Sequence, residues 1–146
     1  PALNTPNFVA LGMKDLSDRG DAVMLTSNPP ENRGRGGFTG RATDNYKFKV
    51  PQLYNMVDSP FYGHGASFTT IREVLAYKNR GVAENPRVPA GQLDPRFHPL
   101  GLTEHELDVL AEYLGEALRD PSLARYQPSR VLSGQPFPVD DHYSAP

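Results

Sequence analysis

The fold is decided by residues 47–79, which read KFKVPQLYNMVDSPFYGHGASFTTIREVLAYKN. This stretch contains a short extended run, a Gly- and Pro-rich loop with one His, and a segment with strong helix signals. Thr70 and Glu73 form a capping box, in which each side chain can bond a free backbone N–H of the first turn. Gly81 is a typical C-terminal stop, so the spacing predicts an amphipathic helix between Thr70 and Gly81.

The apolar stripe of this helix contains an unusual residue. Ile71, Val74 and Leu75 recur at helical spacing, and the next position on the same face is Lys78. In one interpretation its stem lies along the apolar face while the ammonium reaches water or a carboxylate. In the other, the amine is desolvated and deprotonated, and it ligates a metal or acts as a base. Tyr77 lies beside the stripe, and we expect it to be half-buried packing.

Length and charge set broad limits on the function. The chain has 146 residues, which is enough for one domain with a modest core. Its net charge of -2 gives no electrostatic reason to expect a nucleic acid or an anionic membrane as partner. No apolar run approaches the ~20 residues needed to span a bilayer. The chain opens at Pro1 without a Met, from which we expect a processed chain or a piece of a longer one.

Cysteine is absent, which removes disulfides, thiolate metal sites and covalent c-type haem attachment within these residues. The 13 Gly and 15 Pro, with 38% hydrophobic residues, favour loops over a small helical core. Residues 26–46, which include Pro29, Pro30 and four glycines, are expected to be a loop for most of their length. No strand is predicted before this Gly-rich part and no helix after it, which argues against a nucleotide site.

A second helix is predicted from about residue 104 to residue 118, opened by a capping box of Thr103 and Glu106. Its expected buried stripe is Leu107, Leu110, Ala111, Leu114, Ala117 and Leu118, and its expected solvent face is Glu104, Asp108, Glu112 and Glu116. Together these patterns predict a mainly α fold with long Gly- and Pro-rich loops and little strand. After Pro121 the chain continues as a Pro- and Ser-rich tail.

Few residues are candidates for catalysis or for binding a metal or haem. His64 is flanked by glycines just ahead of the first helix, where a ligand can approach the backbone. It is either a hydrogen-bonded surface residue or a group that moves protons near neutral pH. Met13 is expected to be a core residue, with a thioether that is also a known type of axial haem ligand. No pair of His has the spacing of helical metal ligands, and no hydrolase nucleophile motif is present.

Several motifs in order give this chain a family resemblance. They are Phe48-Lys49-Val50-Pro51, Leu53-Tyr54-Asn55, Tyr62-Gly63-His64, residues 68–79, Pro99 to Thr103, and the GRGGFTG segment at 34–40. In this order and spacing the chain resembles the C-terminal part of bacterial di-haem cytochrome c peroxidases, the family that includes the MauG proteins. Tyr54 departs from the family, which has an Arg there, and so puts a propionate contact at this position in doubt.

The resemblance implies a fold of two cytochrome-c-like helical domains, each with a c-type haem. Residues 1–127 would then be most of the second domain, and residues 128–146 an extended tail. The family's Cys-x-x-Cys-His attachment motif is absent from this chain. Haem c would therefore be attached outside it, on the remainder of the protein or on a second polypeptide. The resemblance also implies a small electron-donor protein as partner and a periplasmic location.

Site residues follow from the same resemblance. His64 corresponds to the family's loop His, which lies between the haems near the peroxide-reducing pocket. Lys78 falls where the family has the distal axial ligand of the second haem, a Met in the peroxidases and a Tyr in the MauG type. Tyr77 is the alternative if the register differs by one residue. Ser59 and Phe61 fall where the family offers backbone carbonyls to calcium, which makes calcium a further candidate cofactor.

Two functions remain open from the sequence. The first is part of a haem-dependent oxidoreductase, in which electrons pass between haems and reduce hydrogen peroxide or oxidise a substrate. In this function His64 assists proton transfer. Lys78, Tyr77 or Met13 is the axial ligand that tunes the reduction potential of the iron. The second is a haem-free structural or interaction module on the same scaffold, which the missing Cys favours.

Overall fold

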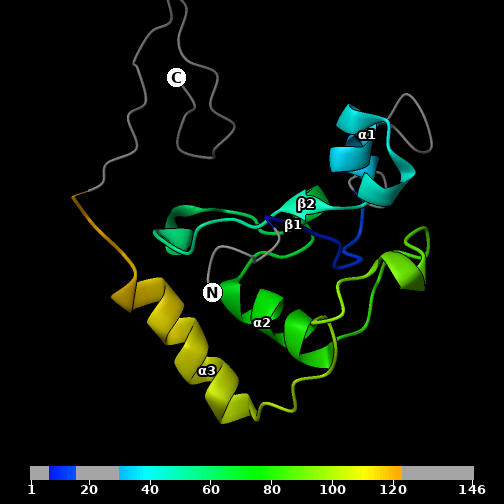
Figure 1. Ribbon diagram of the computed structural model, residues 1–146. Helices are drawn as coiled ribbons and strands as arrows, with labels where there is room; N and C mark the ends of the chain where they lie inside the picture. The colour runs from blue at the N-terminus through cyan, green and yellow to red at the C-terminus, as the bar shows by residue number, and fades with distance from the viewer. Residues whose placement is uncertain (1–6, 16–29, 123–146) are drawn as a thin grey trace, which may run out of the picture.

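The computed structural model describes residues 7–15 and 30–122, and this part of the chain is mainly helical with a single ladder of two short strands (Figure 1). In chain order the elements are β1 (Phe8–Val9), η3 (Pro30–Arg33), α1 (Arg35–Thr39), η4 (Ala42–Asp44), β2 (Phe48–Lys49), η5 (Met56–Asp58), η6 (His64–Ala66), α2 (Ile71–Arg80), η7 (Ala90–Gln92), α3 (Glu104–Glu112) and η8 (Tyr113–Ala117). The predicted mainly α class is confirmed. The expected boundary between residues 127 and 128 lies outside the described residues.

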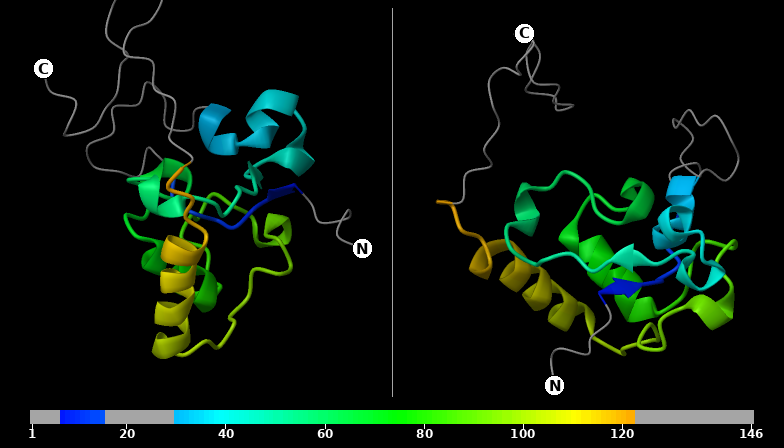
Figure 2. Two further views of the ribbon diagram at one scale, coloured as in Figure 1. Left: turned by 90° about the vertical axis from the view of Figure 1, so that its left-hand side faces the viewer. Right: turned by 45° about the horizontal axis from the view of Figure 1, so that its top comes forward.

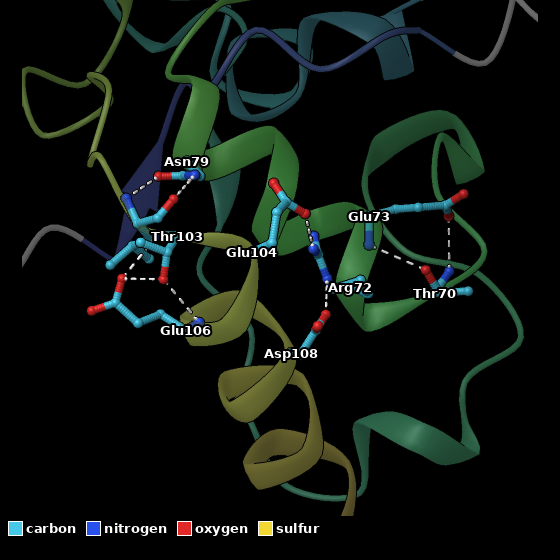
Figure 3. A network of polar contacts seen from close by, with 9 residues as sticks. Thr70, Arg72, Glu73, Asn79, Thr103, Glu104, Glu106 and Asp108 are labelled. Carbon is cyan, nitrogen blue, oxygen red and sulfur yellow. Dashed lines mark hydrogen bonds and ion pairs between the residues drawn. The ribbon is translucent and has the colours of Figure 1, made fainter.

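Helix α2 begins and ends where the sequence predicts. The hydroxyl of Thr70 accepts a hydrogen bond from the backbone N–H of Glu73 at 3.1 Å. The Glu73 carboxylate in turn accepts from the backbone N–H of Thr70 at 3.0 Å, which completes the capping box (Figure 3). At the other end Gly81 takes the left-handed conformation, with φ of 60°. The prediction of this helix is confirmed at both ends.

Helix α3 also has its predicted capping box, between Thr103 and Glu106 (Figure 3). Its predicted buried stripe is correct only in part. Leu107 is buried, but Leu110 and Ala117 are exposed, and the buried residue near the end is Gly115. After Leu110 the helix widens into the π-helical turn η8, and this widening rotates the residues from Tyr113 onward, Ala117 among them, away from the 100° spacing of an α-helix.

Helices α2 and α3 pack against each other and are joined by polar contacts (Figure 3). Arg72 on α2 pairs with two carboxylates of α3, Glu104 and Asp108. Asn79 on the last turn of α2 holds the chain just before α3: its amide donates to the carbonyl of Leu102 and accepts from the N–H of Leu102, both at 2.9 Å. These bonds fix the start of α3 beside the end of α2.

The Gly-rich segment is not a loop as expected, because residues 35–39 form the short helix α1. Its glycines serve close packing. A Cβ on Gly36 would lie 2.0 Å from Oδ1 of Asn45, and one on Gly37 would lie 2.1 Å from the carbonyl oxygen of Pro30. Gly40 ends the helix with φ of 69°. Sequence reasoning treated these glycines as breakers, whereas here the missing side chains allow η3 and η4 to approach α1.

The antiparallel pair β1 and β2 lies between α1 and the α2–α3 pair, as Figure 1 and the left-hand view of Figure 2 show. Phe8 pairs with Lys49 and Val9 with Phe48. The weak alternation around Phe48 therefore marks a real strand of two residues. This short ladder ties the N-terminal segment to the segment that leads to His64.

The core of the described residues is small. Its buried apolar side chains are Ala10, Phe68, Ile71, Tyr77, Val88 and Leu107, and its buried polar residues are Asp15, Asn32 and Asn85. Tyr77 is 0% exposed, so the expectation that it is half-buried is wrong. The reason is tertiary, because aromatic rings from two other segments, Phe68 and Phe97, cover it. Among the described helices, none combines the length and apolar character needed to cross a bilayer.

Candidate functional site

The His64 loop is held in a closed shape. Tyr62 and Phe68 exchange two backbone hydrogen bonds, of 2.8 and 3.2 Å, and so close the loop between them. Gly63 and Gly65 have φ of 77° and 74°, a conformation that residues with a Cβ rarely adopt. The predicted Gly-flanked loop is therefore a defined turn, and the glycines are needed for it. It places the imidazole at a fixed point.

The His64 ring is half-buried and has two side-chain neighbours from distant segments. Its Nε2 lies 3.2 Å from Oδ1 of Asn32, and its ring stacks on Phe48 with centroids 4.1 Å apart. Burial lowers the pKa of His64, and the carboxylate of Asp15 partly offsets this lowering. The imidazole is therefore neutral near pH 7, the state that can accept a proton.

A buried carboxylate that is paired with an exposed guanidinium lies in the same part of the molecule. Asp15 is 1% exposed, and its carboxylate accepts a hydrogen bond of 3.1 Å from the guanidinium of Arg87. The positive partner compensates a carboxylate that would be costly to bury alone. The effect of Asp15 on the pKa of His64 is smaller than that of burial. The pair also joins the N-terminal segment to the 82–99 loop.

Met13 is brought close to the His64 loop. Its sulfur lies 3.1 Å from the point that a Cβ on Gly63 would occupy, and the ring of Phe68 lies 3.2 Å from the same point. The thioether is thus next to the turn that carries His64. The prediction of a core position agrees with its partial burial, and its role as a ligand stays a prediction.

Tyr77 lies on the other side of Phe68. The two ring centroids are 5.2 Å apart, and the ring of Phe97 is 5.3 Å away on a further side. The Tyr77 hydroxyl donates a 2.5 Å hydrogen bond to the carbonyl of Leu11. Burial, with a smaller contribution from Glu84, raises the pKa of Tyr77 to about 12. Its phenol is therefore neutral and already hydrogen-bonded.

Lys78 is exposed, and within the described chain it makes no hydrogen bond or ion pair. Surrounding protein atoms lower the pKa of its amine by desolvation. Water still reaches the side chain, which agrees with the interpretation in which the amine of Lys78 reaches water. The role of Lys78 as an iron ligand stays a prediction.

The predicted calcium position lies in a separate loop. The backbone N–H of Ser59 ends η5, and the side chain of Phe61 is 48% exposed. The nearby carboxylate of Asp58 is paired with Arg119 at 3.3 Å. In the described residues no three His, Cys, Asp or Glu side chains come together as a metal site. A calcium site here would depend on backbone carbonyls, as the sequence prediction states.

Residues 50–61, which we call the exposed apolar loop, carry five large apolar side chains that face solvent. They are Val50, Leu53, Tyr54, Val57 and Phe61. Asn55 fixes this loop beside the end of η8: its amide donates to the carbonyl of Asp120 at 3.1 Å and accepts from the N–H of Asp120 at 2.7 Å. So much exposed apolar surface in one loop is typical of a surface that another group or protein covers.

Two surface hollows lie away from the predicted site residues. One of about 430 Å³ is lined by residues such as Phe8, Lys47 and Asp94, and one of about 340 Å³ by Tyr54 and residues 117–120. The lining of neither includes His64, Met13, Tyr77 or Lys78. These two hollows are therefore separate from the donor side chains that the sequence predicts as iron ligands.

The structure places two of the other predicted residues near the segment that carries His64. Met13 lies beside Gly63 and Tyr77 packs on Phe68, whereas Lys78 is exposed and Ser59 and Phe61 lie in the exposed apolar loop. Sequence reasoning missed Asn32, Phe48, Asp15 and Arg87. Asn32 and Phe48 do lie beside the motifs at 34–40 and 48–51, but nothing in the sequence shows that they contact His64.

Comparisons with known proteins bear on the fold. The chain is similar to a solved MauG-like protein associated with microbial copper homeostasis, with 25% sequence identity and a TM-score of 0.58. The match covers 82% of this chain and 34% of that one. No protein-family model and no curated protein matches the sequence. In its fold, the chain is thus similar to about a third of a MauG-like protein.

Proposed function

We propose that this chain is part of a haem-dependent oxidoreductase of the di-haem cytochrome c peroxidase type, with His64 as its proton-transfer residue. The observation that carries the proposal is a neutral, half-buried imidazole held in a closed turn, on a fold similar to that of a MauG-like protein. Ala66 in this turn has φ of 52°, a strained conformation for a residue with a Cβ, and such positions concentrate at functional sites. Haem c, attached outside this chain, would supply electron storage and transfer to the oxidant.

Side chains of this chain could line one side of a haem site. Lys78, Met13 and Tyr77 offer an amine, a thioether and a phenol, all of which are donors to iron. Lys78 has no competing partner in the described chain, whereas Tyr77 would have to give up its hydrogen bond to Leu11. The order of preference is therefore Lys78, then Met13, then Tyr77. Calcium at the carbonyls of Ser59 and Phe61 stays part of the proposal.

The proposed partner is the haem-carrying remainder of the protein or a second polypeptide, and the exposed apolar loop is the surface that it would cover. Chain coverage supports this, because the match spans only 34% of the similar structure. A small electron-donor protein would deliver electrons, and the location would be periplasmic. In the reaction, hydrogen peroxide takes up two electrons and two protons and yields two waters. His64 would accept a proton from one peroxide oxygen and return it to the leaving oxygen.

The proposal is tested by spectra and turnover of the native protein produced with a supply of haem. We expect a Soret band, and we expect Lys78→Met to change the spin state or reduction potential of the iron. His64→Ala should lower peroxide turnover by about 10²- to 10⁴-fold, whereas His105→Ala, an exposed His on α3, should not. A colourless protein beside a haem-loaded control, or full turnover in His64→Ala, would refute the proposal.

A second candidate function is a haem-free structural or interaction module. The missing Cys and the hydrogen-bonded Tyr77 hydroxyl favour it. In this case the exposed apolar loop would bind a protein partner without any haem. The two functions are separated by the same spectrum, since only the first requires a Soret band.

A further inference from the structure

Asn32 is a buried polar side chain of the described residues and has a direct contact with His64. It is 1% exposed, and its Oδ1 lies 3.2 Å from Nε2 of His64. Buried amide oxygens accept hydrogen bonds in folded proteins, and this contact gives the oxygen a donor. Asn32 belongs to η3, directly ahead of the tightly packed α1, and this packing holds the amide in place.

The contact determines which nitrogen of His64 carries the proton. An amide oxygen can only accept a hydrogen bond, so Nε2 has to donate. A neutral imidazole has one N–H, and its other nitrogen, Nδ1, therefore holds a lone pair. The stacked ring of Phe48, 4.1 Å away, restricts tilting of the imidazole. Orientation and tautomer of His64 are thus fixed by two residues outside its own loop.

We propose that Asn32 is a positioning residue that keeps His64 in the Nε2–H tautomer and leaves Nδ1 as the atom that accepts the proton. The part of this inference that concerns catalysis rests on the proposed peroxidase function. In that reaction the Nδ1 lone pair would take a proton from one peroxide oxygen and return it to the other as the O–O bond breaks. The donor protein would supply the two electrons through the haem and water would supply two further protons, so that one peroxide yields two waters.

The charged groups around His64 do not replace Asn32 in this role. Asp15 acts on the pKa of His64 through its charge, and it is itself bonded to Arg87. A charge at a distance favours the protonated ring but does not choose between the two neutral tautomers. The choice requires a hydrogen-bond acceptor at one nitrogen, and Asn32 is that acceptor.

The test is long-range ¹H–¹⁵N NMR of the imidazoles in the 146-residue chain, with His64→Gln used to assign the His64 signals among the four His. We expect the wild type to show His64 with Nε2 protonated and Nδ1 bare. Asn32→Leu, of similar size but without an acceptor, should lose this preference and show a mixture of tautomers. Asn32→Asp keeps an acceptor, so it should retain the tautomer and raise the pKa of His64.

Asn79→Leu is the matched control, because it removes an Asn that is hydrogen-bonded at the α2–α3 junction, away from the His64 contacts. It should leave the His64 tautomer unchanged. In the haem-loaded native protein, Asn32→Leu should also lower kcat for peroxide on the order of 10- to 100-fold, and Asn32→Asp should restore part of it.

A wild-type signal with Nδ1 protonated, or an unchanged tautomer in Asn32→Leu, would overturn the inference. If Asn32→Leu does not fold, the wild-type tautomer and the Asn32→Asp pKa still decide the question. The NMR result needs no haem, so it is independent of the peroxidase proposal. A colourless protein with the expected tautomer would refute the peroxidase but leave Asn32 as the residue that orients His64.

Discussion

Helices α2 and α3 each begin at a capping box formed by residues close in sequence, whereas the residues around His64 come from distant segments of the chain. Each helix begins with its own capping box, and the two are joined by Arg72 and Asn79 (Figure 3). His64, in contrast, contacts Asn32 from 32 residues away and stacks on Phe48. The difference shows that the scaffold follows local rules, while the candidate site depends on how separate segments meet.

The largest expected effect compares two neighbours on α2, Tyr77 and Lys78. Tyr77→Ala removes a fully buried ring between Phe68 and Phe97, and we expect it to lower the free energy of unfolding by about 3–5 kcal/mol. Lys78→Ala removes an exposed side chain and should change it by less than about 0.5 kcal/mol. Urea unfolding of the two variants measures both. If both variants lost the same free energy of unfolding, the apolar stripe, and not the tertiary contacts, would determine burial on this helix.

An intermediate effect is expected at Gly36, where local and tertiary rules give opposite signs. Helix propensity alone predicts that Gly36→Ala stabilises α1 by about 1 kcal/mol. The new Cβ would lie 2.0 Å from Oδ1 of Asn45 and 2.6 Å from its Cα, so we expect a loss of about 1–3 kcal/mol in thermal or urea unfolding. Gly91→Ala is the control, because no atom lies within 4 Å of its Cβ position. A gain in stability at Gly36 would contradict the close packing around α1.

The smallest expected effect is a pH dependence that arises from His64. Burial lowers its pKa in the folded state below 6.5, so the unfolded state binds the proton more readily. Stability should be constant above about pH 6.5 and should fall as the pH decreases from there towards the lowered pKa. Urea unfolding across this range, in the wild type and in His64→Gln, measures the effect. We expect a flatter profile for His64→Gln, and identical profiles would show that His64 is not buried enough to titrate abnormally.

Where sequence reasoning failed, a tertiary contact was the cause. The Gly-rich segment was expected to be a loop because Gly usually breaks regular structure, yet Gly36 and Gly37 permit η3 and η4 to pack on α1. Tyr77 was expected to be half-buried because it lies beside the stripe, yet Phe68 and Phe97 enclose it. In both cases the deciding atoms belong to other segments of the chain, and no periodicity can reveal them.

The sequence by itself determined the two main helices, their capping boxes, the Gly turn that carries His64 and the mainly α class. These features follow from hydrogen bonds and backbone preferences within a few residues of chain. Only the tertiary structure decided that Tyr77 is enclosed, that Lys78 is exposed, and that Asn32 and Phe48 hold the imidazole. The physical reason is that burial and hydrogen-bond partners depend on which distant segments meet, and that depends on the packing of the whole chain.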